Sequence, residues 1–135
     1  MKITTVWFDN DKIFIRTDDG QELWQSLLWY PRLRYATKKQ RMEYEFDDDS
    51  IRWEELDEDV SLESFLYDDP EPIGVAKFFH QYSELNASAI ARRMGIQQSL
   101  WTAYVNGTKT PSKKRVKEIE KTVRDFGKEL SAIEL

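Results

Sequence analysis

The chain has 135 residues, of which 40% are hydrophobic and 13% aromatic, and this supply of apolar side chains excludes wholesale disorder. It contains no cysteine, which excludes disulfides, thiol catalysis and cysteine-based zinc sites. The net charge is −5, but residues 1–72 carry −10 and residues 73–135 carry +5. An acidic half joined to a basic half predicts two modules with different partners. The alternative is a single domain that acidic residues solvate at one end.

The chain shows no signal for a membrane or for export. No apolar run approaches the roughly 20 residues that a membrane span needs. The first residues, Met1 to Thr5, lack the apolar stretch and small-residue cleavage site of a signal peptide. We therefore expect a soluble, cytoplasmic protein with no membrane partner.

Three short extended segments open the chain, separated by turn-forming residues that include Gly20. Their β-branched and aromatic side chains predict an antiparallel meander. The segments are residues 3–8, 12–17 and 21–25. The apolar stretch that follows, at residues 27–31, is expected to pack on this sheet. Thr37 and Gln40 then have the spacing of a capping box, which predicts a short helix through about Met42.

The rest of the acidic half predicts a hairpin and a closing helix. Residues 44–46 and 51–53 alternate around a turn of three aspartates and a serine, and Ser61 has the character of an N-cap for a helix over residues 62–66. Between them, Asp57-Glu58-Asp59 is interpreted as a turn that Leu56 and Val60 anchor. Two prolines in residues 68–72 then predict a linker, and we place the domain boundary between residues 69 and 70.

After the prolines the apolar period becomes that of helices. Val75, Phe78, Phe79 and Tyr82 recur at spacings of three and four, which predicts an amphipathic helix. Further helices are expected over residues 85–94, 97–105 and 113–130. Short connections between them predict a compact bundle. The fold class is therefore α+β: a small antiparallel-sheet domain, residues 1–69, followed by an all-α domain, residues 70–135.

Residues 90–107 have the pattern of a helix-turn-helix. Ala91 is small enough for a close helix crossing, and Gly95 tolerates the left-handed backbone of a tight turn. Ile96 is then expected to plug the core, with Trp101 and Tyr104 inward on the second helix. This leaves Gln98, Ser99 and Thr102 outward near its N-terminal end, where side chains can reach base edges in the major groove.

At these residues the chain resembles the lambda-repressor-like, or XRE-type, helix-turn-helix regulators. The matching elements are Leu85-Asn86, Ile90-Ala91, Met94-Gly95-Ile96, Trp101, Tyr104, Asn106-Gly107 and Pro111-Ser112. The resemblance implies a lambda-repressor-like bundle over about residues 73–130. It implies base or groove contacts from Gln97, Gln98, Ser99 and Thr102, and phosphate contacts from Asn106, Lys109, Lys113 and Lys114. Trp101 is larger than the aliphatic residue usual at its position. This departure from the family's pattern concerns the expected base contacts more than the expected fold.

The acidic half is similar to a second family. Residues 31–37, with Pro-Arg-Leu and Ala-Thr, and residues 53–61, with Trp-Glu-Glu-Leu-Asp-Glu-Asp-Val-Ser, resemble a bacterial family of small domains of unknown function. The resemblance covers about residues 1–68 and implies a small α+β fold. Members of that family often occur beside toxin-antitoxin-like or helix-turn-helix partners.

No arrangement of residues indicates catalysis. The sequence shows no Ser-His-Asp set, phosphate-binding glycine loop or histidine cluster, and the single histidine, His80, lies beside Phe79 in an amphipathic helix. The acids at 9–11 and 57–59 lack the supporting residues of a calcium loop. We expect no enzymatic activity, no cofactor and no metal site.

The leading hypothesis is a sequence-specific DNA-binding transcriptional regulator that occupies double-stranded DNA as a homodimer. Its specific form is an antitoxin-like repressor of its own operon, with a protein partner on the acidic domain. The alternative is a protein–protein interaction module that never binds DNA, which the net acidity favours, because binding a polyanion needs a basic face.

Overall fold

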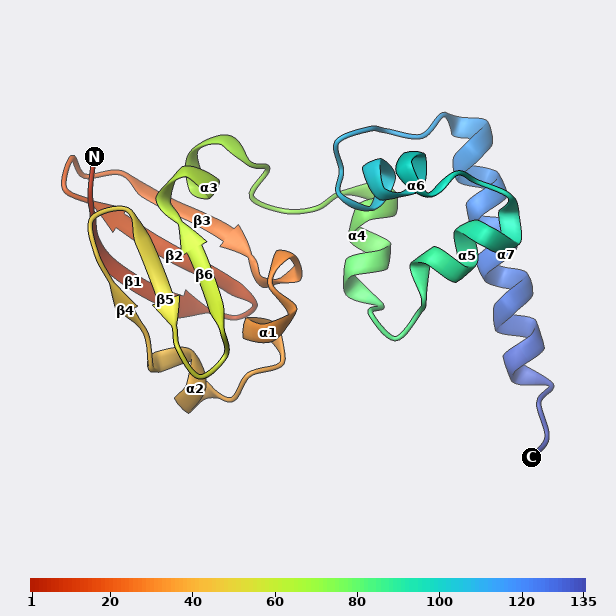
Figure 1. Cartoon of the computed structure of the whole chain (residues 1–135), viewed down its shortest axis with the longest axis horizontal. Coiled ribbons are helices and arrows are strands. Elements are labelled where there is room, and N and C mark those ends of the chain that lie inside the picture. Colours follow the sequence, from red (N-terminus) through yellow and green to blue (C-terminus); the bar gives the residue numbers. More distant parts are fainter. The chain divides into compact units, whose positions relative to one another are not determined.

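The computed structural model describes residues 1–135, and its internal contacts divide the chain into two compact units, Met1–Pro72 and Ile73–Leu135. The division falls three residues after the predicted boundary. Unit 1 is a mixture of strands and short helices, and unit 2 is entirely helical, so the chain is α+β (Figure 1). Each unit has its own hydrophobic core and is described by itself.

Unit 1 begins with a three-stranded antiparallel sheet in the order β1-β2-β3. The strands are β1 (Ile3–Asp9), β2 (Lys12–Thr17) and β3 (Glu22–Ser26). Asn10 and Gly20 have positive φ in the two connecting turns. The predicted meander is therefore confirmed, because turn residues that tolerate the left-handed region sit between β-rich segments.

A second antiparallel sheet has the order β4-β5-β6, with β4 (Glu45–Phe46), β5 (Ser50–Trp53) and β6 (Glu58–Ser61). The predicted hairpin over β4 and β5 is confirmed. The predicted turn at Asp57-Glu58-Asp59 is wrong in part: only Asp57, with φ of 49°, lies in the turn, and Glu58 begins a strand. Asp59 pairs across the ladder with Arg52, and their side chains form an ion pair of 2.8 Å. The ladder with β5 and the burial of Val60 hold the acidic segment extended.

Short helices connect and cover the sheets: the 3-10 turn η1 (Leu27–Trp29), α1 (Pro31–Arg34), α2 (Lys38–Met42) and α3 (Leu62–Tyr67). The capping box of α2 is confirmed, because Thr37 Oγ1 accepts from the Gln40 amide at 3.1 Å and Gln40 Oε1 accepts from the Thr37 amide at 2.9 Å. Ser61 caps α3 as predicted, accepting from the Ser64 amide at 3.2 Å.

The two sheets pack face to face over one core (Figure 1), with Ile13 and Ile15 from β2 opposite Ile51 and Trp53 from β5. Leu27 is fully buried in this core, as the apolar stretch at 27–31 predicts. The predicted linker is part of unit 1 rather than a free connection. Its carbonyls accept from the Ser26 amide (2.6 Å, to Pro70 O) and from the Trp29 indole nitrogen (3.0 Å, to Asp69 O).

Unit 2 consists of α4 (Gly74–Gln81), α5 (Ala87–Met94), α6 (Gln98–Val105) and α7 (Lys113–Ser131). Its core contains Phe79, Trp101 and Tyr104 with Ile119 of α7. The predicted amphipathic helix is α4, which ends at Gln81 and leaves Tyr82 exposed as its C-cap.

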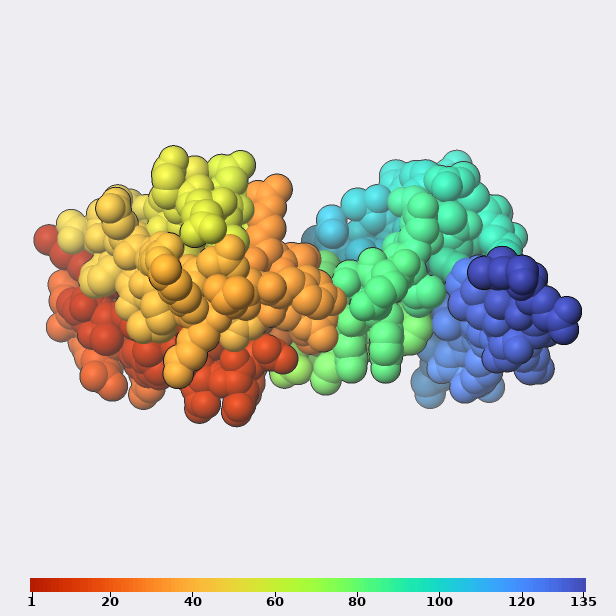
Figure 2. Space-filling view, turned by 90° about the horizontal axis from the view of Figure 1, so that it is seen from below, coloured from red at the N-terminus to blue at the C-terminus, as the bar shows by residue number.

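Two contacts fix the helices of unit 2. The Nε2 of His80 lies 2.9 Å from the carbonyl oxygen of Val105 and links α4 to the end of α6. Helix α7 packs against α5, and Figure 2 shows the residues of α7 (blue) next to those of α5 (green). None of the helices combines the length and the apolar character that a membrane span requires.

Candidate nucleic-acid interface

Helices α5 and α6 are joined by a three-residue turn with defined hydrogen bonds. Gly95 has φ of 74°, its amide donates to Arg92 O at 3.2 Å, and the Ile96 amide donates to Ala91 O at 3.0 Å. These are the two bonds of a Schellman motif, which ends a helix in a left-handed residue followed by an apolar contact. Ile96 and Ala91 are buried, so the turn is held by the core as well as by its hydrogen bonds.

Helix α6 has one buried and one exposed side. Trp101 is 1% exposed and packs edge-to-face on Phe79, with ring centroids 5.0 Å apart, and Tyr104 is also buried. Gln98 and Thr102, four residues apart and therefore on the same side of the helix, are exposed. The other two residues of the predicted base-contact set, Gln97 and Ser99, are exposed as well. The four polar side chains thus surround the N-terminal half of α6.

Gln98 is the one of these side chains with a defined partner. Its Nε2 donates to the carbonyl oxygen of Ser88, in the first turn of α5, at 3.3 Å. An amide nitrogen has two hydrogens and the amide oxygen is an acceptor, so one donor and one acceptor of Gln98 remain available. The bond therefore orients the amide without using up the pair of groups that a base edge requires.

The N-terminus of α6 has a positive electrostatic character. Gln97 is the N-cap but makes no side-chain capping bond, and the first turn contains no acidic residue. The first amides of a helix have no intrahelical partner and lie at the positive end of the macrodipole. This end of α6 is consequently suited to an anion such as a phosphate.

The loop after α6 is fixed on that helix. Both the Lys109 amide (3.2 Å) and the Thr108 hydroxyl (3.3 Å) donate to the carbonyl oxygen of Ala103. Asn106 is the exposed C-cap of α6, and Lys109 is exposed in the loop. These bonds hold the backbone that bears Asn106 and Lys109 close to the C-terminal end of α6.

The first turn of α7 is unusually basic. Ser112 caps the helix by accepting from the Arg115 amide at 3.2 Å, and Lys113, Lys114 and Arg115 follow with no acid among them. Cations are unfavourable at a helix N-terminus, where the macrodipole is positive. Arg115 is paired with Glu118 at 3.2 Å, whereas Lys113 and Lys114 are exposed and have no ion pair. The arrangement opposes the stability of the helix and favours a bound polyanion.

Arg92 and Arg93, in the last turn of α5, have different surroundings. Arg93 forms two hydrogen bonds with the carboxylate of Glu129, at 3.3 and 3.1 Å, and its guanidinium lies over the ring of Phe126. It is a link between α5 and α7. Arg92 is exposed, as are the lysines at 109, 113 and 114.

The acids of unit 1 are organised around one arginine. Glu54, Asp57 and Asp59 lie 3.2, 3.0 and 2.8 Å from the guanidinium of Arg52. Their hydrogen bonds and charges raise the pKa of Arg52 above its already high ordinary value. In the β4–β5 turn, the amide hydrogens of Asp49 and Ser50 lower the pKa of Asp47. One cation for three carboxylates leaves this surface negative.

Unit 1 is thus a small acidic domain with two antiparallel sheets, and unit 2 is a basic four-helix domain with a tight turn between α5 and α6. The family model described as "Protein of unknown function (DUF2442)" matches residues 3–71, and the chain belongs to this family. The predicted membership of a domain-of-unknown-function family is confirmed for unit 1. No curated protein and no solved structure matches the chain.

Proposed function

We propose that the chain is a sequence-specific DNA-binding transcriptional regulator, in which α5 and α6 form a lambda-repressor-like helix-turn-helix. The observation that supports this proposal most directly is the sidedness of α6. Trp101 and Tyr104 occupy the core, while Gln98, Ser99 and Thr102 project polar groups from the N-terminal half of an exposed helix. This is the part of such a helix that meets base edges.

The size and chemistry of α6 suit the major groove. Eight residues make a helix roughly 12 Å long. A glutamine can pair with both N6 and N7 of adenine, and Gln98 keeps one donor and one acceptor for such a pair. Thr102, one turn further on, has a hydroxyl that can serve as donor or acceptor and a methyl group that can contact thymine. Gln97 and Ser99 complete the proposed set of groove-facing residues.

Phosphate contacts are assigned to the residues on either side of this helix. The free amides at the start of α6, the C-cap Asn106, and the exposed Lys109, Lys113 and Lys114 would hold the DNA backbone. Such contacts fix the register of the protein on the duplex and carry no sequence information themselves. The absence of ion pairs at the three lysines supports this role.

In this proposal the protein represses by occupying a promoter, and a homodimer presents two copies of α6 to a two-fold operator. The acidic unit 1 would then bind a protein partner, and an antitoxin-like repressor of its own operon is the specific form. The alternative function, a protein-interaction module that does not bind DNA, is favoured by the charge of −10 on residues 1–72.

A gel-shift titration with the DNA immediately upstream of the protein's own gene distinguishes the two. We expect retention that survives an excess of random competitor DNA and weakens when salt is raised, because phosphate contacts release counterions. A complex that random DNA abolishes, or no complex at all, would favour the interaction module.

A further inference from the structure

The outer face of the first sheet carries three aromatic side chains in a row. Ile13 and Ile15 of β2 point into the core of unit 1, so Phe14 between them lies on the opposite face. In the ladder, Phe14 pairs with Trp7 of β1 and with Trp24 of β3. All three aromatic side chains are partly exposed, and none belongs to a hydrophobic core. Figure 2 shows the first two strands (red) and the second sheet (yellow) on opposite sides of unit 1, so the row lies at the surface.

Two cations of β2 lie on either side of this row. The Nζ of Lys12 is 4.3 Å from the ring centroid of Trp24, and the guanidinium carbon of Arg16 is 5.3 Å from the ring centroid of Trp7. Each cation has an acidic residue directly opposite it in the ladder but makes no ion pair with it. A cation that lies over an aromatic ring keeps its charge and its hydrogen-bond donors. Both positive charges are therefore available to a group from outside the chain.

The face is poorly suited to single-stranded nucleic acid. Such strands bind where aromatic ring faces are open to bases and a basic groove follows the phosphates. Here the rings of Trp7 and Phe14 stack on each other, with centroids 5.4 Å apart and planes 8° apart, and a cation lies over each tryptophan. Residues 1–72 also carry a net charge of −10, which repels a polyanion. The ligand of this face is therefore acidic without being a long polyanion.

The face is also unfavourable for a second copy of itself. Lys12 and Arg16 lie on either side of Phe14 along the central strand of the sheet. A two-fold axis that relates two such faces must lie in the plane between them. An axis along β2 would place Arg16 opposite Arg16 of the second copy, and an axis across the strands would place Arg16 opposite its Lys12. Both arrangements bring like charges together.

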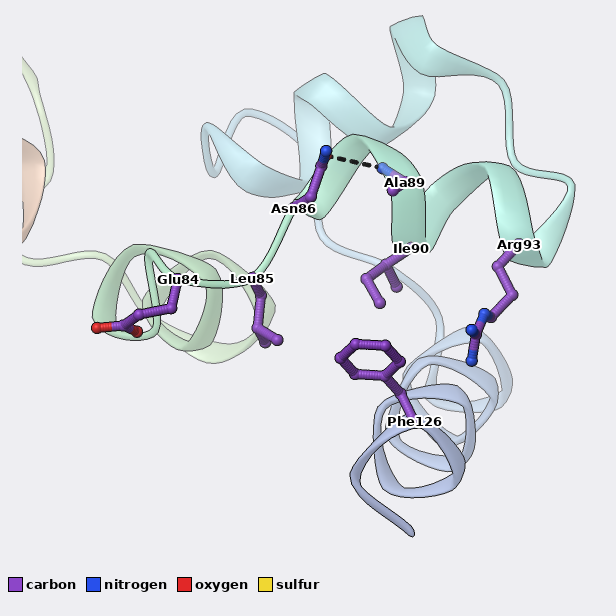
Figure 3. A pocket seen from close by; sticks show the side chains of 7 residues that line it. All are labelled: Glu84, Leu85, Asn86, Ala89, Ile90, Arg93 and Phe126. Atoms are coloured by element: carbon purple, nitrogen blue, oxygen red, sulfur yellow. Dashed lines mark hydrogen bonds between the residues drawn. The ribbon is translucent and has the colours of Figure 1, made fainter. Parts of the chain in front are cut away.

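The groove of unit 2 has no comparable free charge. Its volume is about 250 Å³, and its apolar lining includes Leu85 and Phe126. Asn86 caps α5 with its side chain, and Arg93 is paired with a carboxylate of α7. Figure 3 shows the capping bond of Asn86 and the carboxylate of Glu84 turned away from Leu85 and Phe126. The polar groups beside the groove are thus used within unit 2 or directed away from it.

We propose that the outer face of the first sheet binds an extended acidic segment of another protein. Two carboxylates of this segment, four residues apart, pair with Lys12 and Arg16, and an apolar residue midway between them contacts Phe14. Residues four apart in an extended chain lie on one face and about 13 Å apart, so a segment that runs along β2 matches the spacing of the two cations. Tryptophan and arginine are also among the residues that contribute most to binding at protein interfaces.

The inference rests on the part of the proposed function that gives unit 1 a protein partner, and it names the surface and the chemistry of that partner. Its test contains no DNA. A failure of this inference therefore leaves the proposed DNA binding untouched, and a failure of DNA binding leaves this inference untouched.

Proton–nitrogen correlation NMR of the full chain observes this face directly, because each of the five tryptophans gives one indole signal. The probe is a synthetic peptide with two glutamates four positions apart and a leucine midway between them, on a background of serine and threonine. We expect titration with the peptide to shift the indole signals of Trp7 and Trp24 and to leave those of the buried Trp53 and Trp101 in place. The variants Trp7→Phe and Trp24→Phe, which keep an aromatic ring, assign the two signals.

Lys12→Gln together with Arg16→Gln should weaken peptide binding about fivefold, because two exposed ion pairs are lost. Lys38→Gln together with Lys39→Gln is the matched control, since it makes the same change of net charge at two exposed lysines of α2. This control should bind the peptide as the natural chain does. A peptide with glutamines in place of both glutamates should bind the natural chain more weakly by the same factor of about five.

The absence of shifts at Trp7 and Trp24 with millimolar peptide would overturn the proposal. Equal peptide affinities of the two double variants would also overturn it, because the two cations would then have no specific role. If oligothymidylate shifts the same two signals at lower concentrations than the peptide does, the face binds nucleic acid and the assignment to an acidic protein segment is wrong.

Discussion

Replacing Gln98 and Thr102 with alanine tests the proposed base contacts most directly. The two side chains are on the same side of α6, and neither is charged, so the double exchange removes hydrogen-bonding groups without changing attraction to phosphates. A good contact to a base contributes about 1–3 kcal/mol of discrimination. Two lost contacts amount to at least about 2 kcal/mol, so we expect affinity for the cognate operator to fall by roughly 30-fold or more, with affinity for scrambled DNA unchanged.

The effect on folding should be far smaller. Gln98→Ala removes one exposed hydrogen bond, the 3.3 Å contact with Ser88 O, whose net contribution is about 0.5 kcal/mol. Thr102→Ala gains a few tenths of a kcal/mol or more in helix propensity, which offsets this loss. The thermal midpoint should therefore move by only a few degrees.

Fluorescence anisotropy with labelled operator and scrambled duplexes gives the required comparison. Thr122→Ala, the same exchange on α7, is the control and should bind as the natural chain does. The assignment of Gln98 and Thr102 is refuted if the double variant binds the operator with unchanged affinity. It is also refuted if both duplexes lose affinity equally.

Three further results are expected. Lys113→Ala with Lys114→Ala should weaken binding to all DNA alike and reduce the slope of log K against log salt by roughly 1.8 for each bound protomer. A sequence-selective loss would contradict the phosphate role. Gly95→Ala should destabilise unit 2 by about 1–2 kcal/mol in urea denaturation, because the backbone there has a left-handed φ of 74°. Gly95→Asn should destabilise it less, because asparagine tolerates this region better. Equal stabilities of the two variants and the natural chain would contradict the backbone strain. Burial raises the pKa of Tyr30, whose hydroxyl donates to Gln25. As pH rises, Tyr30 therefore ionises in the unfolded chain before it ionises in the folded chain. The free energy of unfolding then falls from about pH 10 up to the raised pKa. Urea denaturation at about pH 8 and pH 11 should show that Tyr30→Phe loses less stability between the two pH values than the natural chain does. An identical loss of stability would contradict the role given to Tyr30.

Features encoded within a few neighbouring residues were predictable from the sequence. The capping box at Thr37 and Gln40, the cap at Ser61 and the left-handed Gly95 each depend on bonds that span three to five residues. The burial of Trp101 and the exposure of Gln98 followed from helical periodicity in the same way. These are interactions that the local sequence specifies almost completely.

Features that depend on distant partners were not predictable in this way. The strand β6 forms because it pairs with β5 and buries Val60 in the core of unit 1, whereas its sequence, rich in acids, favours a turn. The segment around Pro70 packs on unit 1 because its carbonyl accepts from Ser26, 44 residues earlier. Tyr82 is exposed because α4 ends one residue before it, and the apolar period contains no signal for that end.

The fold gives some cations of unit 2 a partner within the unit and leaves others without an ion pair. In the sequence, Arg93 and Lys113 are equivalent members of one basic half, but the structure gives Arg93 a carboxylate 36 residues away and an aromatic ring. Lys113 and Lys114 have no such partners, and they occupy a helix end where the macrodipole makes each cation unfavourable by about 0.3–1 kcal/mol. A basic residue that stabilises its own fold needs no external partner. Basic residues that weaken the helix in which they lie are the ones for which a bound phosphate supplies a physical reason.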